Sequence, residues 1–196
     1  ENFGLGSQMM SHDERYERAE EYMDVVYQLW EHSWEDDAAI RDKERDIHND
    51  PSKVHEINYE GKYFRVPGPH MCEPSPQRSP VIFQAGSSDR GVRFAARHAE
   101  GVFGIYPSIE GCRTYVTKVR EAAKKFGREK DDLKIFPGIT VVVDESDEAA
   151  KDKLENLKKY SSPEGALALF SGWIGIDLAA LPSTDNIAEM KTDAIQ

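Results

Sequence analysis

The chain has 196 residues and a formal net charge of −11, with 36 acidic residues against 25 lysines and arginines. This negative balance argues against a surface for nucleic acid or for an anionic membrane. No apolar run approaches the roughly 20 residues of a membrane-spanning helix, and the first residues do not resemble a secretory signal.

The length suffices for one sizeable core or for part of a larger domain. The chain begins with Glu1 rather than methionine, and its last stretch ends inside a helix-like pattern, so both ends suggest a piece of a longer protein. Cys72 and Cys112 lack the spacing of a metal or redox motif. A reducing compartment, the cytoplasm, is therefore expected.

The strongest helical pattern covers residues 11–31. Ser11 can cap this helix, Asp13 and Glu14 place negative charge in its first turn, and apolar residues recur at helical spacing. Such a stripe is most simply a surface that faces the core.

The next segment, residues 34–70, reads as an insertion. Residues 34–54 are charged and aperiodic and predict a surface loop, whereas residues 55–66 alternate around a glutamate and a glycine and predict a short hairpin. Prolines between positions 67 and 80 then mark an extended connection to the next strand.

Strand and helix patterns alternate from there on. The predicted strands are 80–86, 101–106 and 133–144, and the predicted helices are 89–100, 109–127 and 146–160, the last opened by Ser146. The first strand has no polar alternation, as expected of a parallel strand buried on both faces. Residues 161–196 contain a short helix and then a punctuated segment whose apolar residues, Trp173, Ile174 and Ile176, are expected to pack against something.

This alternation predicts an α/β protein with a parallel sheet, either a (β/α)8 barrel or a doubly wound sheet. Three βα units cannot close a barrel, which again indicates a fragment.

Residues 85–88, with the sequence Ala-Gly-Ser-Ser, follow the first of these strands, at the edge of the sheet where α/β proteins bind ligands. Gly86 and Gly91 permit a close approach or a positive φ, Ser87 and Ser88 offer hydroxyl groups, and the next helix begins with unpaired amides. Together these features predict a phosphate cradle, to which Arg90 can add charge. The alternative is that Ser88 or Asp89 only caps the helix and that the glycines only form the turn.

His12 and Tyr16 form a second candidate pair, because residues four apart share one face of a helix. An imidazole and a phenol can bind and stack on a planar polar ligand. The alternative is a surface histidine beside a half-buried tyrosine. His48, His55 and His70 lack the spacing of a zinc site, so no metal is expected. There is also no nucleophile elbow and no base near Cys112.

Several blocks together resemble one family, the bacterial-luciferase-like flavin monooxygenases, in the group of nitrilotriacetate, dibenzothiophene-sulfone and long-chain alkane monooxygenases. The blocks occur in that family's order at residues 2–4, 12–38, 53–69 and 76–103. The resemblance implies that residues 1–196 are part of a (β/α)8 TIM barrel of the luciferase-like type, incomplete here.

The resemblance also implies the chemistry. Family members use reduced FMN (FMNH2) from a separate NAD(P)H:flavin reductase, and O2 adds to the flavin as a C4a-peroxyflavin that oxygenates a small sulfur-, nitrogen- or alkane-type substrate. They are usually dimers. His12 and Tyr16 match flavin-contacting positions, and the loop that holds the FMN phosphate is matched by Ala85, Gly86, Ser87 and Ser88.

The sequence departs from the family pattern because the earlier strands and the closing part of the barrel are absent, so the chain alone is expected to be inactive. Residues 34–70 and 161–196 are candidates for a lid, and no catalytic acid or base can be named. Two other functions stay open, namely a barrel enzyme for a sugar phosphate and a non-catalytic flavin-binding subunit.

Overall fold

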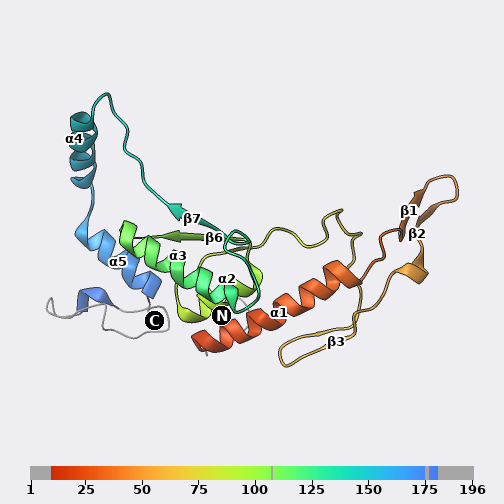
Figure 1. The fold of residues 1–196 in the computed structure, drawn as a ribbon. Coiled ribbons are helices and arrows are strands. Elements are labelled where there is room, and N and C mark those ends of the chain that lie inside the picture. The colour runs from red at the N-terminus through yellow and green to blue at the C-terminus, as the bar shows by residue number, and fades with distance from the viewer. Residues whose placement is uncertain (1–9, 107, 175–176, 181–196) are drawn as a thin grey trace. The chain divides into compact units, whose positions relative to one another are not determined.

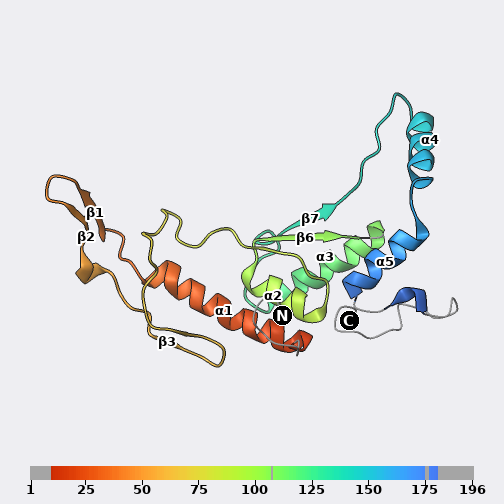
Figure 2. The same ribbon diagram turned by 180° about the vertical axis from the view of Figure 1, so that it is seen from behind.

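The computed structural model describes residues 10–106, 108–174 and 177–180. The chain divides into two compact units, residues 1–137 and residues 138–196, and each has its own architecture. Figures 1 and 2 show the elements from opposite sides. Within the described ranges, no helix is both long and apolar enough to cross a bilayer.

Helix α1 (His12–His32) begins where the sequence predicts. Ser11 accepts a hydrogen bond from the Glu14 amide, and the Glu14 carboxylate accepts one from the Ser11 amide. This capping box satisfies donors that a helix start leaves unpaired. On the core side of α1, Met23 and Val26 pack against Phe94, which lies much later in the chain.

A hairpin follows α1 where the sequence predicts a surface loop. Strand β1 (Ala39–Asp42) pairs with β2 (Ile47–Asn49) in antiparallel orientation, so the loop predicted over residues 34–54 is wrong in part. The Asp42 carboxylate accepts hydrogen bonds from the amides of Glu44 and Arg45, and Asp46 has a φ of 53°. Polar turn chemistry therefore closes this hairpin, and apolar alternation could not reveal it.

The hairpin predicted over residues 55–66 is confirmed. After a short 3-10 turn, η1 (Pro51–Lys53), β3 (Tyr59–Glu60) pairs with β4 (Arg65–Val66) in antiparallel orientation. The Glu21 carboxylate on α1 accepts hydrogen bonds from the amides of residues 62–64, at 2.8 to 3.1 Å. One side chain of α1 thus holds the turn of this hairpin.

The centre of the first unit is a three-stranded sheet in the order β5–β6–β7, formed by Phe83–Gln84, Gly101–Ile105 and Lys134–Gly138. Strands β5 and β6 are parallel, with Phe83 opposite Gly101. Helices α2 (Asp89–His98) and α3 (Ile109–Lys124) connect the strands and lie on the same side of the sheet (Figure 1). The predicted βα alternation is confirmed here, and its core contains Val92, Ala95, Ala99, Val102, Tyr115, Val119 and Leu133.

The other face of the sheet is exposed in the part of the chain that the structure describes. Val81 and Phe83 are 59% and 60% exposed, and on β6 the fully buried Val102 alternates with Phe103 and Ile105, which are 48% and 79% exposed. Successive side chains of a strand point to opposite faces, and helices cover only one of them. The prediction that residues 80–86 are buried on both faces is therefore wrong for this chain.

The second unit contains α4 (Asp147–Lys158), capped by Ser146 as predicted, α5 (Pro163–Ile174) and the 3-10 turn η2 (Leu178–Ala180). The strand predicted over residues 133–144 forms only at β7, and beyond it Ile139, Val141 and Val143 are exposed. A strand needs a neighbouring strand for its backbone groups, and residues 139–144 have none among the described elements. The predicted packing of Trp173, Ile174 and Ile176 lies outside the described side chains.

Candidate functional site

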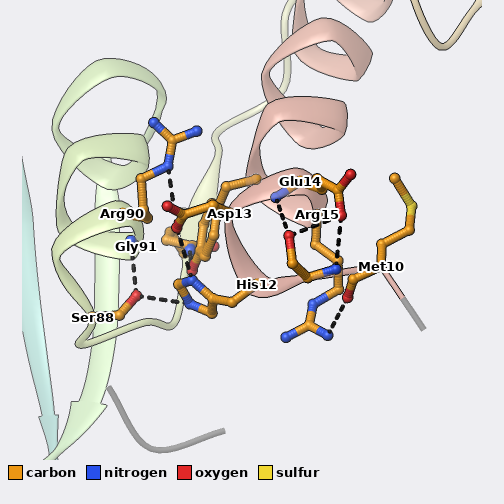
Figure 3. Close-up of polar contacts among 11 residues, drawn as sticks. Met10, His12, Asp13, Glu14, Arg15, Ser88, Arg90 and Gly91 are labelled. Carbon is orange, nitrogen blue, oxygen red and sulfur yellow. Dashed lines mark hydrogen bonds and ion pairs between the residues drawn. The ribbon is translucent and has the colours of Figure 1, made fainter. Parts of the chain in front are cut away.

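The first turn of α1 lies beside the beginning of α2, and this brings two sets of predicted site residues together. The His12 imidazole Nε2 is 3.2 Å from the Ser88 hydroxyl, although 76 positions separate the two residues. The rings of His12 and Tyr16 have centroids 5.0 Å apart. Figure 3 shows His12 next to Ser88 and Asp13, with Arg90 on the far side of Asp13. The predicted pairing of His12 with Tyr16 on one face is thus confirmed.

Ser88 caps α2, as the simpler alternative proposes, and it also belongs to this cluster. Its hydroxyl accepts a hydrogen bond of 3.1 Å from the Gly91 amide, which is the usual arrangement at a helix start. The same oxygen faces His12, whose side chain is 13% exposed. The Ser88 hydroxyl therefore both caps α2 and contacts His12.

Glycine avoids a clash at position 91 and a tight contact at position 86, because Tyr16 approaches the backbone closely. A Cβ atom at Gly86 would lie 3.0 Å from the Tyr16 hydroxyl, and one at Gly91 would lie 2.7 Å from it. Neither residue has a positive φ. Of the two roles that the sequence leaves open for these glycines, close approach is the one that the structure supports.

The loop and the helix start present unpaired donors. The amides of residues 87–90 donate to no acceptor within the described ranges, and the amide of Gly91 is taken up by Ser88. Arg90 Nε is buried without a hydrogen-bond partner in the same part of the chain, 3.8 Å from the Asp13 carboxylate. Amides at a helix start, hydroxyl groups and a guanidinium are the donor set that an anion requires. The residues present therefore fit a bound phosphate group.

The loop also forms one wall of a cavity of about 590 Å³. Ala85, Gly86 and Ser87 line it from the loop, and the rest of the lining comes from the end of β6 and from α3: Phe103, Gly104, Ile105, Tyr106, Gly111, Thr114, Tyr115 and Lys118. Of the four predicted loop residues, Ser88 faces His12, whereas Ala85, Gly86 and Ser87 line this cavity. Lys118 at the cavity pairs with Asp89 and holds the pKa of that carboxyl below its usual range.

Sequence reasoning missed the contact that one of two tyrosines beside the loop makes with it. The Tyr115 hydroxyl donates a hydrogen bond of 2.7 Å to the Gly86 carbonyl, and burial raises the pKa of Tyr115 to about 12. The Tyr106 hydroxyl is buried without a hydrogen-bond partner in the described structure. Helical spacing marks Tyr115 as a core residue, but nothing in the sequence connects its hydroxyl to Gly86.

Comparison with known proteins gives this arrangement a context. Residues 1–185 match the family model described as luciferase-like monooxygenase. The chain belongs to the luciferase-like monooxygenase family.

Two curated relatives show how much of a family member the chain represents. It is 52% identical to a dimethyl-sulfide monooxygenase of Hyphomicrobium sulfonivorans, over 100% of the chain and 40% of that protein. It is 39% identical to nitrilotriacetate monooxygenase component A of Aminobacter aminovorans, over 90% of the chain and 39% of that protein. The chain thus spans about two fifths of the length of these relatives.

Solved structures of family members agree in fold. A crystal structure of a long-chain alkane monooxygenase matches 98% of the chain and 44% of its own, with a TM-score of 0.88 and 52% identity. A crystal structure of a riboflavin lyase with modified FMN and riboflavin matches 98% of the chain and 43% of its own, with a TM-score of 0.90 and 38% identity. The prediction of an incomplete luciferase-like barrel is confirmed.

The three histidines between positions 48 and 70 have partners close to them in the chain or in the insertion. His48 contacts Asn49, His55 contacts the Glu35 carboxylate, and His70 contacts the Cys72 carbonyl. No cluster of three or more possible metal ligands occurs among the residues that the structure describes.

Proposed function

We propose that this chain belongs to the FMNH2-dependent oxygenase of a two-component monooxygenase, and that it supplies the site for the FMN phosphate. The observation that carries the proposal is the set of unpaired amides at residues 87–90 beside His12 and Tyr16, in a chain of the luciferase-like family. The riboflavin lyase, a relative, has a crystal structure with modified FMN, which supports this choice of nucleotide.

In this proposal Ser87, Ser88 and the amides of residues 87–90 hold the phosphate, and Ala85 and Gly86 complete the loop. His12 and Tyr16 contact the flavin nucleotide through their ring edges and polar atoms. Reduced flavin, when bound, supplies the activation of O2 from which one oxygen atom passes to the substrate. The chain's own residues bind and orient the nucleotide, and no acid or base is assigned.

The names of the relatives support a proposal for the substrate and partner of the full-length protein. Their names include a sulfide, an alkane and an aminopolycarboxylate, so we propose a small sulfur-, nitrogen- or alkane-type organic substrate. The words component A in one name support a partner, for which we propose an NAD(P)H:flavin reductase. We further propose a homodimer in the cytoplasm. The 196-residue chain alone should not turn over, because it covers 40% of the dimethyl-sulfide enzyme.

Residues 34–70 and 161–196 are proposed as parts of the enclosure that keeps water from the reacting flavin. The first segment is well anchored where it leaves α1. The Trp34 indole donates to the His70 carbonyl at 2.8 Å, and Arg78 donates to the Trp34 carbonyl at 2.6 Å. The first of these bonds joins the two ends of the segment that carries both hairpins.

Substitution of the two hydroxyls tests the nucleotide site. The Ser87→Ala/Ser88→Ala double variant should weaken FMN binding tenfold or more, because hydrogen bonds to a charged group contribute about 1.5–3 kcal/mol. Riboflavin, which lacks the phosphate, should bind the variant and the wild type equally. Titration calorimetry with both ligands measures the difference.

Ser146→Ala is the matched control. Ser146 caps α4 through a bond of 3.2 Å that resembles the Ser88 cap of 3.1 Å, so its loss should lower stability by about 1 kcal/mol without changing FMN affinity. Equal FMN affinity in the double variant and the wild type would refute the phosphate site. Turnover is tested in the full-length protein by supplying a reductase, NADH and a panel of sulfur, nitrogen and alkane compounds. Peroxide without any oxygenated product would instead favour a flavin-binding subunit.

A further inference from the structure

Tyr115 holds the candidate phosphate loop from the side of α3. Its hydroxyl donates to the Gly86 carbonyl at 2.7 Å, while its ring packs in the core between α2, α3 and β6 and is only 8% exposed. The Tyr16 hydroxyl meets the same loop from α1, within 3.0 Å of where Cβ atoms at positions 86 and 91 would lie. Because a close-packed core leaves a buried ring little freedom, the Gly86 carbonyl is held in one place.

The position of this carbonyl determines the direction of the next amide. The Gly86 carbonyl and the Ser87 N–H belong to one peptide unit, which is planar and trans, since the described chain has no cis peptide bond. In a trans unit the C=O and N–H groups point in opposite directions. The bond to Tyr115 thus turns the Ser87 N–H away from that phenol, and this amide donates to no acceptor in the described ranges.

The phenol remains a donor under ordinary conditions. Burial raises the pKa of Tyr115 to about 12, with smaller contributions from the nearby Tyr106 and Tyr16. At neutral pH the hydroxyl therefore keeps its proton and its bond to Gly86.

We propose that Tyr115 is a positioning residue of the nucleotide site: by holding the Gly86 carbonyl, it orients the Ser87 amide toward the phosphate of a flavin nucleotide. The inference rests on the proposed function. It concerns the arrangement of the loop and assigns Tyr115 no contact with the ligand itself.

The chain offers a matched control in Tyr106. The two phenol rings lie side by side, with centroids 5.1 Å apart, and both hydroxyls are removed by substitution with phenylalanine. The Tyr106 hydroxyl has no hydrogen-bond partner among the described residues, so its loss breaks no bond to the loop. Tyr115→Phe and Tyr106→Phe thus differ in one hydrogen bond.

The test compares both variants with the wild type in the purified protein. In Tyr115→Phe, ¹⁵N relaxation should lower the order parameters of the Gly86 and Ser87 amides from the roughly 0.85 of rigid backbone toward about 0.6. FMN affinity should fall about three- to tenfold, which corresponds to one net hydrogen bond, while riboflavin affinity stays unchanged. Tyr106→Phe should alter none of these quantities.

Unchanged order parameters in Tyr115→Phe, or an equal loss of FMN and riboflavin affinity, would overturn the inference. A mobile loop in Tyr115→Phe together with a wild type that binds no FMN would support the role of Tyr115 in holding the loop and overturn the proposed function. If Tyr115→Phe fails to fold, the exchange rate of the Tyr115 hydroxyl proton in the wild type tests the inference. Slow exchange of this proton with solvent supports its bond to Gly86, and fast exchange contradicts it.

Discussion

At the scale of single residues, two hydroxyl groups determine how closely α1 and the loop at residues 85–88 approach each other. The Tyr16 hydroxyl lies 2.7 Å from the place of a Cβ atom at position 91, so that position accepts only glycine without a shift. The Ser88 hydroxyl joins the start of α2 to His12. The sequence leaves a close approach or a positive φ open for Gly86 and Gly91, and the structure shows a close approach by a side chain of α1.

Gly91→Ala should therefore be destabilising, although alanine normally favours a helix. The added Cβ would also lie 3.3 Å from the Gly86 carbonyl carbon, so the Tyr16 ring and the loop must move, at a cost of about 1–3 kcal/mol. Urea unfolding measures the change. Gly172→Ala in α5 is the control, because a Cβ there meets nothing within 4 Å and should stabilise the helix by about 0.5–1 kcal/mol. Equal effects of the two substitutions would contradict the crowding at position 91.

Tyr115 should also give the protein a stability change at alkaline pH. Its pKa is raised from 10.0 to about 12 in the folded state, so the folded state retains a proton that the unfolded state loses. The contribution is fully present below about pH 10 and disappears as the pH rises through about 12, for a total of about 2–3 kcal/mol. Unfolding free energies of the wild type and Tyr115→Phe, measured from pH 9 to pH 12, should converge as the pH rises. Parallel curves would show that burial does not raise the pKa of the Tyr115 phenol.

At the scale of elements, one carboxylate connects α1 to the β3–β4 hairpin. Glu21 accepts hydrogen bonds from three successive amides, and its neighbour Glu17 accepts from the Lys62 ammonium and the Tyr63 hydroxyl. A charged acceptor is stronger than a neutral one for such donors. The hairpin is thereby held to the helix whose first turn carries His12.

Glu21→Gln should loosen this hairpin, because an amide group replaces one of the two acceptor oxygens with a donor. The expected loss is about 1–3 kcal/mol in the local opening free energy of residues 62–64, measured by amide hydrogen exchange. Glu60→Gln in the same hairpin removes only an exposed ion pair with Arg65 and should have little effect. Equal exchange rates in both variants would argue against the role of Glu21.

Elements with local signals could be predicted from the sequence, and elements that depend on distant contacts could not. The caps Ser11 and Ser146 mark their helices correctly, whereas the β1–β2 hairpin is closed by Asp42 in a segment without apolar alternation. The same division applies to the site. His12 and Ser88 stand out by residue type and position, but the bond from Tyr115 to Gly86 joins residues 29 positions apart and follows only from packing.

At the scale of the whole molecule, one face of the three-stranded sheet exposes apolar side chains. Phe83 and Phe136 approach each other across this face, with ring centroids 5.5 Å apart, and Phe103 on the intervening strand is also exposed. An apolar surface of this kind favours association with other apolar surfaces. The chain by itself should therefore bind hydrophobic dyes.

Phe103→Lys and Val102→Lys should separate the two faces of β6. Phe103 is 48% exposed, so a lysine there should reduce dye binding and association with little loss of stability. Val102 is fully buried, so a lysine at that position should unfold the first unit. Dye fluorescence and circular dichroism of both variants provide the measurement. Unfolding by Phe103→Lys would show that this face is already covered.

The His12–Ser88 contact has a consequence for how such a protein can diversify. His12 begins α1 and Ser88 caps α2, and the two helices are joined through the packing of Met23, Val26 and Phe94. The two hairpins lie between His12 and Ser88 in the sequence and take no part in their contact. Under the proposed function, exchanging the hairpins among homologues should therefore alter which substrates reach the flavin while FMN affinity stays unchanged.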